Sequence, residues 1–83
     1  MINNTNALGR IIVILMYQLN HELIVQHIGV INKIDFKKCV ISFIDNDTRT
    51  FSFRMPELND LLKNEKLNIS YSDGSTFTNV QIL

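Results

Sequence analysis

Apolar and polar residues alternate most regularly in the second half of the chain. Phe51, Phe53 and Met55 alternate with polar residues at the period of a half-buried strand. A β-branched and aromatic run over residues 39–44 comes before them, and the turn-forming residues 45–48 join the two segments. The pattern therefore predicts a β-hairpin.

A second hairpin is predicted at the C-terminus. Residues 66–72 alternate, and Asp73-Gly74 follows them as a two-residue turn signal. Pairing across that turn fixes the register, because each side chain must stay on its own face of the sheet. We expect Leu67 opposite Val80 and Ile69 opposite Thr78.

Two further elements complete the predicted fold. Residues 56–64 begin with proline at a position that a helix tolerates, and they carry leucines three and four apart, so a short helix is expected there. Residues 22–35 form a long apolar strand around Gly29, where a lone glycine indicates a bulge or a sharp bend. The fold class is mainly β with minor α: a small antiparallel bent barrel or curled sheet of five or six strands, SH3- or Sm-like.

Residues 8–19 are ambiguous, because their apolar side chains fit one helical face while residues 11–14 are β-branched in the manner of a strand. We favour a strand, and the helix stays open. A strand here would be apolar on both faces, and an outer face carrying Ile12, Ile14 and Met16 would need a cover. Self-association as a twofold homodimer through these three residues is the resulting prediction.

Composition limits the class of protein further. The 83 residues fit one domain, 1–83, in which residues 1–8 are a candidate flexible segment, and the formal net charge is zero. The unpaired Cys39 lies in an apolar run, as a reduced core residue would, and the N-terminus has no signal-peptide pattern. We expect a cytoplasmic protein with no membrane segment and no long-range attraction to phosphate.

Signals for catalysis or metal binding are weak. His21 and His27 are the only histidines, and no zinc-ligand spacing exists. Asp45 and Asp47 begin like a calcium loop, but the sixth position holds Thr50 instead of glycine. We expect no cofactor, no metal and no catalytic residue.

One basic segment could contact nucleic acid. Lys and Arg side chains can meet phosphates while a neighbouring aromatic ring stacks on a base. The candidate nucleic-acid face consists of Lys33, Phe36, Lys37, Lys38 and Arg49. The competing interpretation is an ordinary solvated turn.

The order of these segments resembles a known family. Residues 13–17 end in Tyr17, residues 29–35 read Gly-Val-Ile-Asn-Lys-Ile-Asp, and two short apolar strands follow up to Leu58. This order is similar to the YolD-like proteins of low-GC bacteria and their phages, over about residues 11–58. The resemblance implies a small bent barrel associated with DNA-damage tolerance alongside Y-family polymerases. The chain departs from the family pattern at residues 18–21, where an Asp-Gly turn is usual, and in the additional hairpin after residue 66.

The resulting functional prediction is a non-enzymatic interaction module. A short neutral domain rich in Asn, Ile and Lys is typical of bacterial or phage accessory proteins that bind and modulate a larger protein machine. A nucleic-acid-binding barrel is the alternative, and a small-molecule-binding barrel is the third possibility. An enzyme is the least favoured class.

Overall fold

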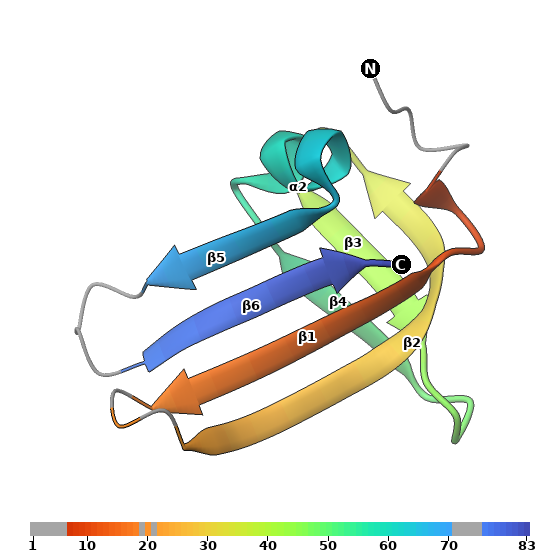
Figure 1. Cartoon of the computed structure of the whole chain (residues 1–83). Helices are drawn as coiled ribbons and strands as arrows, with labels where there is room; N and C mark the ends of the chain where they lie inside the picture. Colours follow the sequence, from red (N-terminus) through yellow and green to blue (C-terminus); the bar gives the residue numbers. More distant parts are fainter. Residues whose placement is uncertain (1–6, 19, 21, 71–75) are drawn as a thin grey trace.

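The computed structural model describes residues 7–18, 20, 22–70 and 76–83. Within these residues, six strands form one antiparallel sheet in the order β4-β3-β2-β1-β6-β5, and a short helix follows β4 (Figure 1). The elements are β1 (Ile11–Gln18), β2 (Leu23–Asp35), β3 (Val40–Ile44), β4 (Thr50–Arg54), α2 (Leu58–Asn64), β5 (Lys66–Ser70) and β6 (Thr76–Ile82). The predicted mainly β class with one short helix is confirmed.

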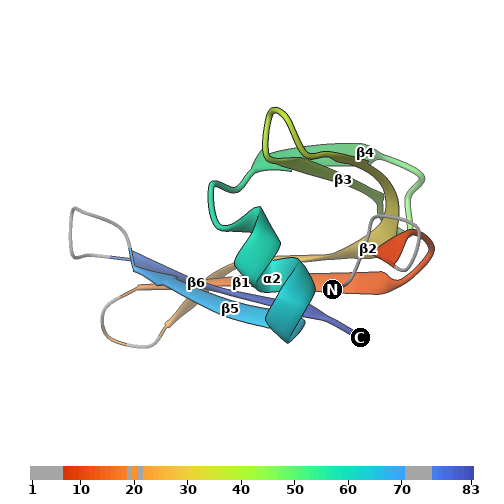
Figure 2. The same cartoon turned by 90° about the horizontal axis from the view of Figure 1, so that it is seen from above.

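The sheet is open, and it curls at β2, the strand that joins β3 and β4 to β1, β6 and β5. The first part of this 13-residue strand pairs with β1, and the last part pairs with β3. The register with β3 shifts between Ile31 and Lys33, and such a bulge increases the local bend of a strand. Figure 2 shows the result: β3 and β4 fold over the rest of the sheet, and α2 lies in the space between the two halves.

Gly29 permits the close approach of β3 to β2. A Cβ atom at this position would lie 2.4 Å from Cδ2 of Phe43 and 2.6 Å from the carbonyl oxygen of Ile44. No side chain fits there without movement of the β3 backbone. The predicted bend is therefore present, but the bulge itself lies at Asn32. Gly29 has a different role, because only a residue without a side chain leaves room for the β3 backbone.

The core fills the inside of the curl and is closed by α2. Leu58, Leu61 and Leu62 of the helix are at most 2 % exposed. The helix ends at Glu65, which adopts a left-handed conformation and donates its backbone N–H to the carbonyl oxygen of Leu61 at 2.7 Å. Among the described residues, thirteen buried apolar ones form this core: Ala7, Ile12, Ile14, Ile31, Ile34, Ile41, Phe43, Met55, Leu58, Leu61, Leu62, Val80 and Ile82.

The strand prediction for the first ambiguous segment is confirmed, but the prediction of its outer face is wrong. Ile12 is 0 % and Ile14 is 2 % exposed, because both point into the core, and Met16 on the same face is half-buried. The outer face carries Ile11, whose exposed fraction is 43 %, and every second residue after it. The prediction assigned the even-numbered residues of this strand to the outside, whereas the structure has them inside, so the two faces are the reverse of those expected.

The C-terminal hairpin has the predicted register. Leu67 pairs with Val80, and Ile69 pairs with Thr78. The turn residues Asp73 and Gly74 lie outside the described residues. The agreement supports the argument that turn chemistry and alternation together specify a register.

The two ends of the described chain meet near the helix. Arg10 donates from Nη1 to Oε1 of Glu65 at 3.0 Å and from Nε to the carbonyl oxygen of Leu83 at 3.0 Å. Ala7, which fell in the candidate flexible segment, is 1 % exposed and belongs to the core. Within the described part of the chain, α2 is too short to cross a bilayer and no other helix has the length and apolarity to do so.

Candidate functional site

An apolar surface lies on the outer face of β1 and β2. Register pairs Ile11 with Val30 and Val13 with Ile28, so that their side chains share this face. The exposed fractions are 43 % for Ile11, 45 % for Val30 and 41 % for Ile28. Ile44 of β3, paired with Val30, extends the surface. We call Ile11, Val13, Ile28, Val30 and Ile44 the outer apolar face.

Neutral polar residues continue this surface. On β6, Gln81 pairs with Val13 and Asn79 pairs with Leu15 of β1. The Asn79 amide donates from Nδ2 to Oδ1 of Asn68 on β5 at 2.7 Å. A hollow of about 320 Å³ opens beside Ile11 and Ile28. The outer face of the β1–β6 pair, at these register positions, therefore offers apolar and amide groups.

The structure separates the predicted nucleic-acid residues into two groups. Lys33 lies near the end of β2, and Phe36, Lys37 and Lys38 lie in the turn that follows it. Arg49 lies in the turn before β4, at the opposite end of the β3–β4 hairpin. Five residues of extended β3 separate the two turns, about 16 Å at 3.3 Å per residue. The prediction that Arg49 joins the other four is wrong.

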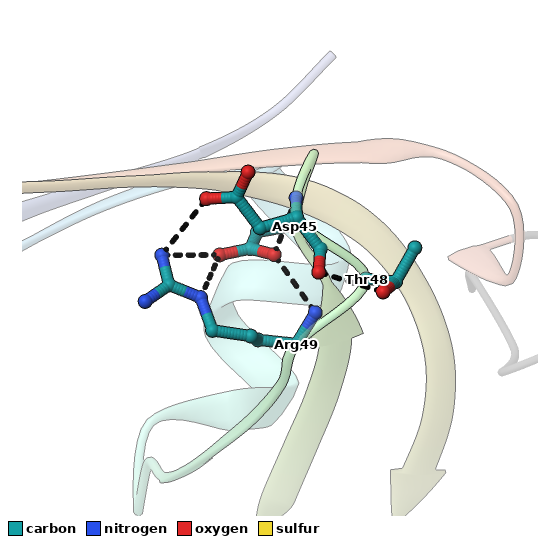
Figure 3. Close-up of polar contacts among 4 residues, drawn as sticks. Asp45, Thr48 and Arg49 are labelled. Carbon is teal, nitrogen blue, oxygen red and sulfur yellow. Dashed lines mark hydrogen bonds and ion pairs between the residues drawn. The ribbon is translucent and has the colours of Figure 1, made fainter.

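Arg49 instead stabilises its own turn. Its guanidinium forms ion pairs with Asp45 at 3.1 Å and with Asp47 at 3.2 Å, and it lies 5.8 Å from the centre of the Phe51 ring. Figure 3 shows Asp45 as the centre of this turn: its Oδ1 accepts the backbone N–H groups of Asp47 and Arg49, each at 2.9 Å. This carboxylate therefore organises a β-turn, as the sequence predicted.

Opposing effects act on the Asp45 carboxyl. Burial acts to raise its pKa, but the backbone N–H groups of Arg49 and Asp47 and the Arg49 charge together lower it. The carboxylate is thus held in its charged form by the turn that it organises. Among the described residues, no three His, Cys, Asp or Glu side chains lie together as metal ligands would.

A basic surface missed by the sequence analysis includes Arg54. Register places Lys33 opposite Ser42, Ser42 opposite Ser52, and Val40 opposite Arg54 on neighbouring strands. The two serine hydroxyls are hydrogen-bonded at 2.8 Å. A hollow of about 190 Å³ lies between Lys33, Lys38 and these serines. Pairing the two predicted strands across residues 45–49 would have placed Arg54 there.

The turn from β2 to β3 presents Phe36 and the lysines to solvent. Asp35 accepts the backbone N–H of Lys38 on its Oδ1 at 3.1 Å, and Cys39 closes the turn with a left-handed φ of 55°. Phe36 is 43 % exposed, whereas Cys39 packs against the core as a partly buried residue. The turn is thus fixed in shape and open at its tip.

His27 is packed among phenyl rings inside the curl. Its ring centre lies 4.8 Å from that of Phe51, 5.4 Å from that of Phe53 and 6.3 Å from that of Phe43. These distances are typical of aromatic packing in a core. His27 therefore has a structural role here, and His21 lies outside the described residues.

Comparison with known proteins gives no relatives. No protein-family model, no curated protein and no solved structure matches the chain. The function is therefore inferred from the surfaces of this molecule alone.

Proposed function

We propose that the protein is a non-enzymatic interaction module that forms a twofold dimer through its outer apolar face and, in that form, binds a larger protein machine. The observation that carries the proposal is the group of four large apolar side chains, each between 36 % and 45 % exposed, that register brings together on β1, β2 and β3: Ile11, Ile28, Val30 and Ile44. Contiguous apolar patches of this kind mark protein-binding surfaces.

The energy available from covering this face is substantial. Fully burying one such side chain is worth about 1.5–3 kcal/mol, so burying a remaining exposed fraction of 40 % or so contributes about 1 kcal/mol. With four such side chains on each of two subunits, the gain is about 8 kcal/mol. Association costs about 4–15 kcal/mol in lost freedom, so this face alone can offset much of that cost.

A second copy fits this face for chemical reasons. The paired positions of β1, β2 and β6 on this face carry no charged side chain, and Asp45, which lines the hollow at its edge, is already paired with Arg49. The adjoining amides of Gln81 and Asn79 each contain donors and an acceptor, and they can therefore pair with copies of themselves. Two such sheets can pack face to face at about 10 Å with strands aligned near −30°.

Sedimentation equilibrium at micromolar concentration tests the proposal. We expect a mass twice the 9.6 kDa of one chain, and we expect Ile28→Lys to give a folded monomer. Asn64→Lys is the matched control, because it adds the same charge at an exposed position at the end of α2 and leaves the dimer intact. A folded wild-type monomer throughout the concentration range would contradict the proposal.

Nucleic-acid binding is the second candidate function. Lys33 and Lys38 line one hollow, register places Arg54 on the same side of the sheet, and the three form no ion pair within the described residues. Phe36, which is 43 % exposed, lies in the same turn as Lys38. The long bent second strand supports kinship with SH3- and Sm-like barrels, and the YolD-like resemblance favours the same function. Binding of single-stranded DNA that weakens steeply with added salt, and that Arg54→Ala reduces, would support this candidate. Binding of single-stranded DNA that neither added salt nor Arg54→Ala weakens would exclude phosphate contacts.

A further inference from the structure

The β4 strand forms one edge of the sheet, and its backbone hydrogen-bonding pattern can be derived from the two ends of the β3–β4 ladder. The Asp45 N–H donates to the carbonyl oxygen of Arg49 at 3.0 Å, and the Met55 N–H donates to that of Cys39 at 2.7 Å. Hydrogen-bonded pairs alternate along an antiparallel ladder, so Phe51 and Phe53 are the residues of β4 that bond to β3.

The other three residues of β4 direct their backbone groups away from the sheet. The N–H and C=O groups of Thr50, Ser52 and Arg54 point outward, and all three residues are exposed. In the part of the chain that the structure describes, no strand lies beyond β4 in the sheet. A partner strand could therefore form a regular ladder with this edge.

Two features that usually prevent strand addition, a bulge and an internal proline, are absent from this edge, whereas its five-residue length and the charge of Arg54 limit which strands can pair with it. The register with β3 is continuous over all five residues of β4, with no bulge, and the only proline follows the strand at Pro56. The opposite edge is different, because β5 follows α2 directly and packs against it. The β4 edge is thus the one built for pairing.

Side chains on the two sides of β4 indicate what an added strand would contain. Phe51 and Phe53 are half-buried on the inner side, where apolar side chains of a new strand would contact their rings. On the outer side, Arg54 forms no ion pair among the described residues. Register places it on the same side of the sheet as a hollow lined by two lysines and one carboxylate, Lys33, Lys38 and Asp35, so the net charge there is positive. Side chains of a new strand on this side would meet positive charge.

We propose that β4 binds an extended peptide segment of a partner protein by strand addition, with apolar residues of the peptide toward Phe51 and Phe53 and acidic residues beside Arg54. Main-chain hydrogen bonds supply affinity in this mode, and alternate side chains supply specificity. The β4 backbone edge adjoins the outer apolar face, because Thr50 pairs with Ile44, but the proposed strand addition uses the outward backbone groups of β4 and does not require the dimer.

The test is an NMR titration of the full chain with two nine-residue probe peptides, one of alternating valine and glutamate and one of alternating valine and lysine. The glutamate peptide binds, and the amide protons of Thr50, Ser52 and Arg54 become protected from solvent exchange. The lysine peptide binds at least tenfold more weakly. Protection elsewhere in the chain, or equal binding of both peptides, contradicts the proposal.

Two variants separate backbone pairing from side-chain effects. Ser52→Pro removes an outward N–H without removing a β3–β4 bond, a position at which edge strands tolerate proline, and it weakens binding of the glutamate peptide at least tenfold. Ser52→Ala is the matched control, since it loses the same hydroxyl bond to Ser42 and keeps the N–H, and it binds as the wild type does.

Arg54→Glu gives an independent test should the proline variant not fold. It reverses the preference, so that the lysine peptide binds more tightly than the glutamate peptide. An unchanged preference for glutamate overturns the proposed charge recognition. Competition by single-stranded DNA for the glutamate peptide, without any loss in Ser52→Pro, would assign the basic surface to nucleic acid instead.

Discussion

Gly29→Ala is the substitution whose cost follows most directly from the curl of the sheet. An added Cβ would lie 2.6 Å from the Ile44 carbonyl oxygen, about 0.8 Å short of an ordinary contact at 3.4 Å. The side chain of Phe43, at 2.4 Å, can rotate, but the Ile44 oxygen belongs to the backbone of β3. Relief of the clash therefore requires β3 to move away from β2.

The magnitude can be estimated from core overpacking, which costs about 1–3 kcal/mol and occasionally more. We place Gly29→Ala at about 3 kcal/mol because backbone has to move. A chain of this length has a free energy of unfolding of about 4–12 kcal/mol, so the loss is a large fraction of the total. The melting temperature should fall by about 10–20 °C.

Urea denaturation followed by far-ultraviolet circular dichroism measures this loss, at one fixed protein concentration because dimerisation makes stability depend on concentration. Gly9→Ala is the control: no atom lies within 4 Å of its added Cβ, and its φ of +84° predicts a smaller cost of about 1 kcal/mol. Adding Phe43→Leu to Gly29→Ala should restore little stability. A change below about 0.5 kcal/mol for Gly29→Ala would refute the close approach of β3 and β2.

Three further substitutions test other parts of the fold. Ile14→Ala should lower the free energy of unfolding, measured with denaturant, by about 2–5 kcal/mol, since Ile14 is only 2 % exposed. A loss below about 1 kcal/mol would indicate that Ile14 lies on the outer face instead. Leu61→Ala, in the helix that closes the curl, should cost about 2–5 kcal/mol in the same assay, and a fully stable variant would show that α2 does not cover the core. The hydrogen bond and the charge of Arg10 lower the pKa of Glu65 below its ordinary 4.5, so their contribution is present above pH 4.5 and is lost as the pH falls below it. Glu65→Gln should therefore flatten the acid side of a plot of melting temperature against pH, and an unchanged plot would contradict the pairing.

Elements with a clear alternation were predictable from the sequence. The C-terminal hairpin is the best case, because the predicted pairs Leu67–Val80 and Ile69–Thr78 both occur. The outer face of this hairpin is polar except for Phe77, since Asn68 pairs with Asn79 and Lys66 with Gln81, and a shift by one residue would bury these polar side chains. Local pattern and tertiary burial therefore agree.

Which face of β1 points into the core was not predictable, because this strand has no polar face. Residues 11–17 are apolar at every position, so the pattern specifies a strand without specifying which face is inside. The choice is made by pairing with distant residues, such as Ile14 with Val80 on β6. Arg54 is a different case, because the predicted β3–β4 hairpin alone pairs Arg54 with Val40 and Ser52 with Ser42, so the sequence contained enough information to place it.

Contacts between methyl groups of two chains test the proposed dimer most directly. In a mixture of isotope-labelled and unlabelled chains, a filtered nuclear Overhauser experiment detects only contacts between different molecules. The proposed function predicts such contacts from the methyl groups of Ile11, Val13 and Ile28, which lie on the outer apolar face. Intermolecular contacts confined to other methyl groups, or none in a sample at millimolar concentration, would contradict it.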